Sequence, residues 1–310
     1  MFSIHTNRSA MTALATLRQI DAQMQTTMQR ISTGLRINDA SDNAAYWSIA
    51  TTLRSDIKAK GAVADTLGLS RAMTDIASAG MSQAVDLAAE IKAKLVLASE
   101  PGVDKTKINK ELDELKAQLV SVVQSSSFNG QNWLYGSPEI ISMPASIKDY
   151  GGFTSVGYIE VDKGATTLID PGNNSNGILT RDRNVTTAGG SAETFYLLGS
   201  GTSGTARQIT LDASTTADDL SGMVQAMEEI EQNLIDANAM LGVKAKGLER
   251  QEAFTKTLIE VSKKALGRLV DADMEEEIAR LKALQVQKQL AIQALAIANS
   301  EPEMILQLFR

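Results

Sequence analysis

Proline placement constrains this 310-residue chain more than any other feature. None of its five prolines falls within residues 1–100 or 172–301. Proline inside an α-helix costs about 3 kcal/mol, because it lacks an amide hydrogen and its ring clashes with the preceding turn. The middle, in contrast, holds 13 of the 22 glycines between Gly130 and Gly204. This distribution predicts helical arms at both chain ends around an irregular or β-rich centre.

The first arm carries a weak helical seam. Residues recur at steps of three and four, which predicts one helix over about residues 4–33 that Gly34 ends. The seam residues are Asn7, Ala10, Leu14, Leu17, Asp21, Met24, Met28, Ile31 and Leu35. Because Asn7, Ala10 and Asp21 occupy places that usually hold large apolar groups, we expect this helix to need partners in order to fold.

Further helices follow from capping signals and apolar spacing. A second helix is expected over about residues 43–99, where Pro101 follows, and a third is expected after Asp104. A capping pattern at Thr216 and Asp219 predicts a fourth helix that ends near Gly267. A last helix follows residues 271–273, and its apolar positions are Met274, Ile278, Leu281, Leu284, Leu295 and Ala298.

The middle of the chain contains short strand-like runs, at Gly157–Asp162, Thr194–Leu198 and Gln208–Asp212. The predicted fold is mainly α and elongated, with coiled-coil-like helical rods from both chain ends and a small β-rich inserted outer domain. Three regions are expected: a terminal helical region of residues 1–42 and 268–310, a helical rod of residues 43–137 and 213–267, and a solvent-facing insert of residues 138–212.

Composition removes most functional classes. The chain has no cysteine and one histidine, His5, so histidine-based triads and cysteine or histidine zinc sites are not expected. A net charge of −7 without a basic run argues against nucleic-acid binding. No apolar stretch is long enough for a membrane span. We therefore expect no enzyme activity, no cofactor and no metal.

Two local motifs favour structural interpretations. Gly199–Gly204 matches GxGxxG, but the residues that follow look like a strand rather than the helix that a dinucleotide loop requires, so we interpret it as a flexible loop. The acidic group at Asp271, Asp273 and residues 275–277 lacks the spacing of a calcium loop, and acidic side chains in a first turn complement the helix dipole. We interpret this group as a cap.

Several segments together resemble one family. The segment from Ile31 to Asn38, with Ala40 and residues 42–45, is similar to the N-terminal signature of bacterial flagellins. His5-Thr6-Asn7 resembles the start of that family, and Phe128-Asn129-Gly130 resembles its FNG turn. Residues 271–273 and 294–299 resemble its C-terminal signature, and residues 41–50 look like the variant found in rhizobial alphaproteobacteria.

The resemblance implies a structural subunit of the extracellular flagellar filament, which serves swimming motility. It implies export in an unfolded state through the flagellar type III apparatus, capture by a flagellin chaperone and polymerisation beneath a filament cap. Expected partners are further copies, sister flagellins and junction proteins, with no nucleic acid and no membrane. The expected assembly interface comprises Leu14, Leu17, Met24, Met28, Ile31, Leu35, Ile278, Leu281, Leu284 and Leu295.

Two alternative functions stay open at this point. A hook-filament junction protein resembles flagellin at both termini, although the signature at residues 31–50 disfavours it. A secreted adhesin could use the insert at residues 138–212. A peptidase-bearing flagellin would need HExxH, which one histidine cannot supply.

Overall fold

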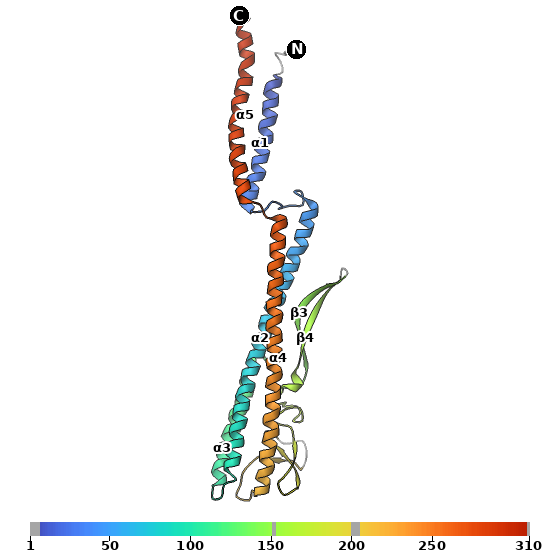
Figure 1. Ribbon diagram of the computed structural model, residues 1–310, viewed down its shortest axis with the longest axis vertical. Coiled ribbons are helices and arrows are strands. Elements are labelled where there is room, and N and C mark those ends of the chain that lie inside the picture. The colour runs from blue at the N-terminus through green and yellow to red at the C-terminus, as the bar shows by residue number, and fades with distance from the viewer. Residues whose placement is uncertain (1–6, 151–152, 200–204, 309–310) are drawn as a thin grey trace. The chain divides into compact units, whose positions relative to one another are not determined.

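The computed structural model describes residues 7–150, 153–199 and 205–308. Long helices dominate it, as Figure 1 shows. They are α1 (Arg8–Thr33), α2 (Ala44–Leu97), α3 (Lys105–Ser125), α4 (Ala217–Val270) and α5 (Met274–Leu308). Seven short or medium strands and one 3₁₀ turn fill the middle: β1 (Ser127–Phe128), β2 (Gln131–Asn132), β3 (Ile140–Tyr150), β4 (Phe153–Asp162), η1 (Lys163–Ala165), β5 (Arg183–Thr186), β6 (Ala192–Tyr196) and β7 (Arg207–Gln208). The predicted class, mainly α with long helices from both chain ends and a small strand-containing insert, is confirmed.

The chain forms two compact units. Unit 1 consists of Met1–Lys58 and Leu258–Arg310, and unit 2 consists of Ala59–Thr257. Unit 1 therefore combines segments from both ends of the chain, whereas unit 2 is one continuous segment. Among the described residues, no helix is long and apolar enough to cross a membrane.

The core of unit 2 is built from one face of each helix. The apolar side chains that step at three and four on α2, α3 and α4 are buried in a single cluster, which includes Leu67, Ile91, Leu95, Leu112, Leu119, Met227, Ile230 and Leu234. Burial of a leucine or isoleucine side chain stabilises a fold by about 1.5–3 kcal/mol, so this cluster dominates the stability of unit 2. The strands pack their apolar side chains against the same cluster.

The expected helix caps are present. Asp104 accepts a hydrogen bond from the Thr106 amide at the start of α3, and Asp273 accepts one from the Glu275 amide at the start of α5. Thr216 and Asp219 form a reciprocal capping box on α4, with the Asp219 amide donating to Thr216 Oγ1 at 3.1 Å. These contacts confirm the sequence-based starts of three helices.

The start of the first helix differs from the prediction. Asn7 has an extended backbone and its side chain accepts from the Ala10 amide at 2.9 Å, so it caps α1 rather than belonging to its seam. Residues 4–6 of the predicted helix lie outside the described residues.

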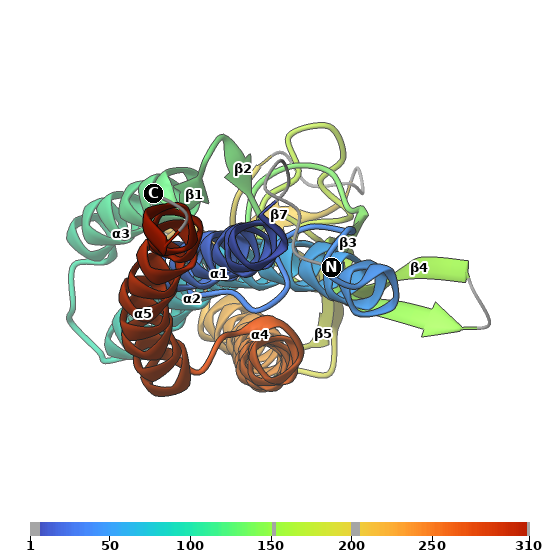
Figure 2. The same ribbon diagram turned by 90° about the horizontal axis from the view of Figure 1, so that it is seen from above.

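The β3–β4 hairpin is longer than the predicted strand at Gly157–Asp162. It pairs residues 140–150 with residues 153–162 in antiparallel register, with a bulge at Ala145 between Pro144 and Ser146. One face packs Met143, Ala145 and Val161 against the core of unit 2. Figure 2 shows this hairpin and α3 on opposite sides of unit 2.

A second small sheet has the order β5-β6-β7, with β5 antiparallel and β7 parallel to β6. The predicted strand at Thr194–Leu198 overlaps β6, but the one at Gln208–Asp212 is wrong in extent, since only Arg207 and Gln208 pair. The segment after β7 is instead held by side chains of α3. Lys116 Nζ donates to the Ile209 carbonyl oxygen, Lys105 Nζ donates to the Thr215 carbonyl oxygen, and the Leu211 amide donates to Asn109 Oδ1.

The capping box gives a pH-dependent prediction. Hydrogen bonds from Thr216 and the nearby Arg207 guanidinium lower the pKa of Asp219 to about 2. A lowered carboxyl pKa stabilises the fold fully above the unfolded value near 3.8, and the contribution is lost as the pH falls towards 2. Asp219→Ala is expected to reduce the free energy of unfolding by about 1 kcal/mol at pH 6. In urea titrations, the gap between the two proteins should narrow between pH 4 and pH 2, and a gap independent of pH would contradict this account.

Candidate functional site

Helices α1 and α5 lie side by side and antiparallel in unit 1 (Figure 1). On each helix, the positions that are at least half-buried repeat at steps of three and four. Beside the repeat on α1, Asp21 and Arg30 are also at least half-buried. The repeating positions are Ala10, Ala13, Leu17, Ile20, Met24, Thr27 and Ile31 on α1, and Glu277, Leu281, Leu284, Lys288, Ala291, Leu295 and Ala298 on α5. We refer to these fourteen residues as the seam. Such a seven-residue repeat is the pattern of a coiled-coil contact.

The expected interface residues fall into three groups in this unit. Leu284 is buried, and Leu17, Met24, Ile31, Leu35, Leu281 and Leu295 are half-buried. Leu14, Met28 and Ile278 are exposed. Sequence reasoning missed Ile20 and Thr27, the two buried side chains of α1, which sit one residue before positions assigned to the repeat.

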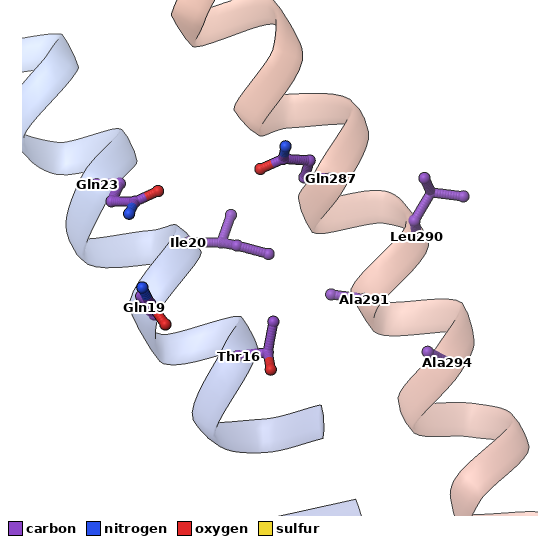
Figure 3. A pocket seen from close by; sticks show the side chains of 8 residues that line it. All are labelled: Thr16, Gln19, Ile20, Gln23, Gln287, Leu290, Ala291 and Ala294. Atoms are coloured by element: carbon purple, nitrogen blue, oxygen red, sulfur yellow. The ribbon is translucent and has the colours of Figure 1, made fainter. Parts of the chain in front are cut away.

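A groove runs between the two helices. One section, of about 460 Å³, is lined by Thr16, Gln19, Ile20, Gln23, Gln287, Leu290, Ala291 and Ala294. In Figure 3, Ile20 of α1 points towards α5, where Ala291 faces it. A second section, of about 450 Å³, shares Gln23 and Gln287 and continues to Thr27, Arg30 and Arg280. The groove holds no arrangement of acid, base and nucleophile that could carry out catalysis.

Polar pairs cross the seam at three levels. Arg30 Nη1 lies 3.0 Å from Glu277 Oε1, and Glu277 is buried. Lys288 Nζ lies 2.8 Å from Asp21 Oδ1. At the far end, Asn7 Nδ2 donates to the Ala298 carbonyl oxygen at 2.7 Å. Polar groups inside a coiled-coil contact reduce its stability, because their desolvation offsets most of the attraction between them.

The two linkers next to these helices are tied together. The backbone of Leu35 bridges to that of Asp271, and the Ala272 amide donates to the Gly34 carbonyl oxygen at 2.9 Å. Next to these linker contacts, a small apolar cluster contains Ile37, Ala50 and Val270, with Leu35, Trp47, Leu266 and Leu269 packed against it. The C-terminal end of α1 and the N-terminal end of α5 are thus held next to each other.

Large apolar side chains also cover the outer sides of both helices. On α5, Ile278, Val286, Leu290, Ile292 and Ile297 are exposed, with 43–66% of their surface accessible. On α1, Met11, Leu14 and Met28 are exposed. A helix that is apolar on several sides is typical of a buried position, so these outer faces are suited to burial against further protein.

The other sequence motifs do not form a chemical site in the described residues. The acidic group after residue 270 caps α5, as predicted, through Asp273. Within residues 7–150, 153–199 and 205–308, no group of three aspartate, glutamate or histidine side chains could hold a metal ion. His5 and residues 200–204 of the GxGxxG match lie outside the described residues.

Comparison with protein families matches both helical arms. Residues 4–139 match the bacterial flagellin N-terminal helical region, and residues 224–309 match the bacterial flagellin C-terminal helical region. The chain belongs to the bacterial flagellin family. The resemblance to the flagellin termini is thereby confirmed. Residues 140–223 of this flagellin lie between the two matches and contain strands β3 to β7.

Relatives of this flagellin match it over its whole length. It is 46% identical over 320 positions to flagellin C of Rhizobium meliloti (strain 1021), and the alignment covers 100% of both chains. Flagellin D of Rhizobium meliloti is 38% identical over 395 positions, and a flagellin of Brucella melitensis biotype 1 is 37% identical over 317 positions, again with 100% of both chains covered. The rhizobial type expected from residues 41–50 is confirmed. The longer alignment with flagellin D also means that this relative has additional residues.

Family membership settles the class of function. This flagellin is a structural subunit of a filament and not an enzyme, as predicted. Its family also implies self-assembly and a place in the extracellular flagellar filament. The junction-protein and adhesin alternatives are not favoured.

Proposed function

We propose that this flagellin assembles by covering the outer apolar faces of α1 and α5 with the same helices of other copies. The observation that carries the proposal is the exposed row on α5, in which Val286, Leu290 and Ile297 are each more than half exposed. At about 25 cal/mol per Å² of apolar surface, burial of such side chains gives a strong driving force for association. Nine of the ten interface residues expected from the sequence belong to this surface or to the seam beside it, and Leu35 packs in the small cluster at the linkers.

The terminal helices fold fully only on assembly in this proposal. The seam between α1 and α5 contains two alanines on each helix and several charged side chains, so it stabilises the isolated pair weakly. The outer faces must therefore contribute the remaining stability. A subunit of this kind stays soluble as a single chain and becomes rigid only inside the polymer.

We also propose the division into three regions, with the terminal region at residues 1–42 and 268–310, the helical rod at residues 43–137 and 213–267, and the insert at residues 138–212. The two family matches, which end and begin near the limits of the insert, support this division. In this arrangement the terminal helices line the inside of the filament, the insert faces solvent, and the helical rods transmit torque from the motor for swimming.

The remaining partners follow from the family. We propose export of the unfolded chain through the flagellar type III apparatus, binding to a flagellin chaperone, and insertion beneath a filament cap into a polymer that begins at junction proteins. Sister flagellins are proposed to co-assemble, and the several flagellins of Rhizobium meliloti among the relatives support this.

Seeded polymerisation tests the proposed function. Purified protein is salted out with short filament seeds, and negative-stain electron microscopy and circular dichroism are recorded before and after. Long uniform filaments with a gain in helicity are expected, since the terminal helices should fold as they join the lattice. A chain that stays a compact, fully helical monomer under all seeding conditions would contradict the proposal and favour a junction or adhesin role.

A further inference from the structure

Helix α5 has apolar side chains on more than one side, so α1 could in principle pack against more than one side of it. The side that faces α1 carries three leucines and two alanines among its seam positions. The exposed sides of α5 carry Ile278, Val286, Ile292 and Ile297, which are larger on average, and Leu290 at the edge of the groove is exposed as well. Apolar burial is non-directional, so by itself it does not favour contact of α1 with the observed side of α5 over contact with another apolar side.

Apolar burial also leaves the register open. The seam positions repeat every seven residues on both helices, so a shift of one repeat again places apolar side chains opposite each other. The linker contacts between Leu35 and Asp271 hold the end at which the helices enter the pair, so a shifted register would also require the turns next to the linkers to unwind. They are about 14 residues along the chain from the middle of α1 and about 20 from the middle of α5.

The charged pairs distinguish the observed side of α5 and the observed register from the alternatives. In the observed pairing, Asp21 meets Lys288 and Arg30 meets Glu277. A shift of seven residues along α5 would instead place Asp21 opposite Leu281 or Leu295, and would move Glu277 away from Arg30. A rotation of α5 that buried Val286 and Ile297 against α1 would break both pairs. Glu277 would keep Arg280 of its own helix as a partner at 3.6 Å, but Asp21 and Lys288 would lose each other. Because a charge without a partner in a covered contact is costly, each alternative is disfavoured.

We propose that Asp21, Arg30, Glu277 and Lys288 are positioning residues that select the face and the register of the α1–α5 pair. Their second effect is to keep the larger apolar side chains of α5 on the outside, where other copies can reach them. This inference rests on the proposed function, because neighbouring copies increase the burial of Asp21 and Lys288, which are each more than one-third exposed in the single chain.

Disulfide mapping can test the inference, because the chain has no cysteine of its own. Three double variants report different pairings. Gln23→Cys with Gln287→Cys reports the observed pairing, since both residues line the same groove. Gln23→Cys with Ala294→Cys reports a shift of one repeat, and Gln23→Cys with Gln289→Cys reports a rotated α5. Filaments are oxidised, and intrachain disulfides are quantified by peptide mass spectrometry, with mixtures of single-cysteine chains as the control for interchain bonds.

Each reporter is placed in three seams. The first is the native one, and the second is an apolar one with Asp21→Leu, Arg30→Leu, Glu277→Leu and Lys288→Leu. The third is a reversed one with Asp21→Lys, Lys288→Asp, Arg30→Glu and Glu277→Arg. In the native seam, the observed pairing should exceed each alternative by about tenfold. The apolar seam should lose most of this preference while filaments still form, and the reversed seam should restore it. An apolar seam that keeps the full preference would overturn the inference.

Failure of the proposed function would look different. It would show as the absence of filaments in electron microscopy from the native-seam variants and from the unmodified chain. The disulfide ratios would then be measured on the single chain, where a native seam without preference for the observed pairing would also overturn the inference.

Discussion

Leu284→Asp should abolish filament formation while leaving the core of unit 2 intact. Leu284 is the one leucine of the α5 seam that is buried, with 5% of its surface accessible, and it lines the groove beside Thr27 and Arg30. Placing a carboxylate there costs about 3 kcal/mol or more, since it removes a buried leucine and buries a charge, while the nearby Arg30 and Arg280 already pair with Glu277. A loss of this size raises the concentration needed for assembly by about a hundredfold.

The measurement is the fraction of protein that sediments as filaments after seeding, together with urea unfolding of the unassembled chain. Leu284→Met is the matched control, because it conserves volume and apolarity and should polymerise almost normally. Leu284 is not part of the unit 2 core, so the urea transition of that core should not move. Normal filament yield from Leu284→Asp would show that pairing of α1 with α5 is not required for assembly.

Gly80→Val should destabilise unit 2 by about 2–3 kcal/mol. Gly80 is buried in α2, and a Cβ at this position would lie 2.9 Å from Leu134 Cδ1 and closer still to Ser126 Oγ. This glycine allows the end of α3 and the segment after β2 to approach the backbone of α2. A branched side chain would force these elements apart, and their separation would disturb the surrounding core.

Urea unfolding followed by circular dichroism measures this effect. Gly61→Ala is the matched control on the same helix, because a Cβ at Gly61 meets nothing within 4 Å. That control should raise stability by up to about 1 kcal/mol, since alanine favours a helix interior over glycine. Equal stability of Gly80→Val and the wild type would contradict the close approach at Gly80.

The helices and their ends could be predicted from sequence because their signals are local. Thr216 with Asp219, Asp104 and Asp273 each act within one turn of the helix that they cap. Absence of proline over long stretches is likewise a property of the chain itself. These features need no knowledge of what packs against the helix, so the caps of α3, α4 and α5 were confirmed. The cap of α2, expected at Asn38, Asp39, Ser41 or Asp42, was wrong, because Asn43 accepts from the Tyr46 amide instead.

The features that escaped prediction depend on partners distant in sequence. Thr27 is buried, but threonine is not an apolar residue, so the sequence pattern places the exposed Met28 in the repeat on α1 instead. Strand β3 contains Pro144, which argues against a strand in the sequence, although Met143, Ala145 and Ile147 alternate with polar or proline positions. Its pairing with β4 and its packing on the core make it a strand. Contacts of this kind can be recognised only when the positions of both contacting segments are known.

The two tryptophans of this chain are divided between its two units. Trp133 is buried in the core of unit 2, with 3% of its surface accessible, whereas Trp47 packs against the small cluster of Ile37, Ala50 and Val270 in unit 1. The protein therefore carries its own pair of optical reporters. Trp47→Phe leaves an emission spectrum that reports on unit 2 alone, and Trp133→Phe leaves one that reports on unit 1. Ordering of the two units can thus be followed separately during growth of a filament, without any attached dye.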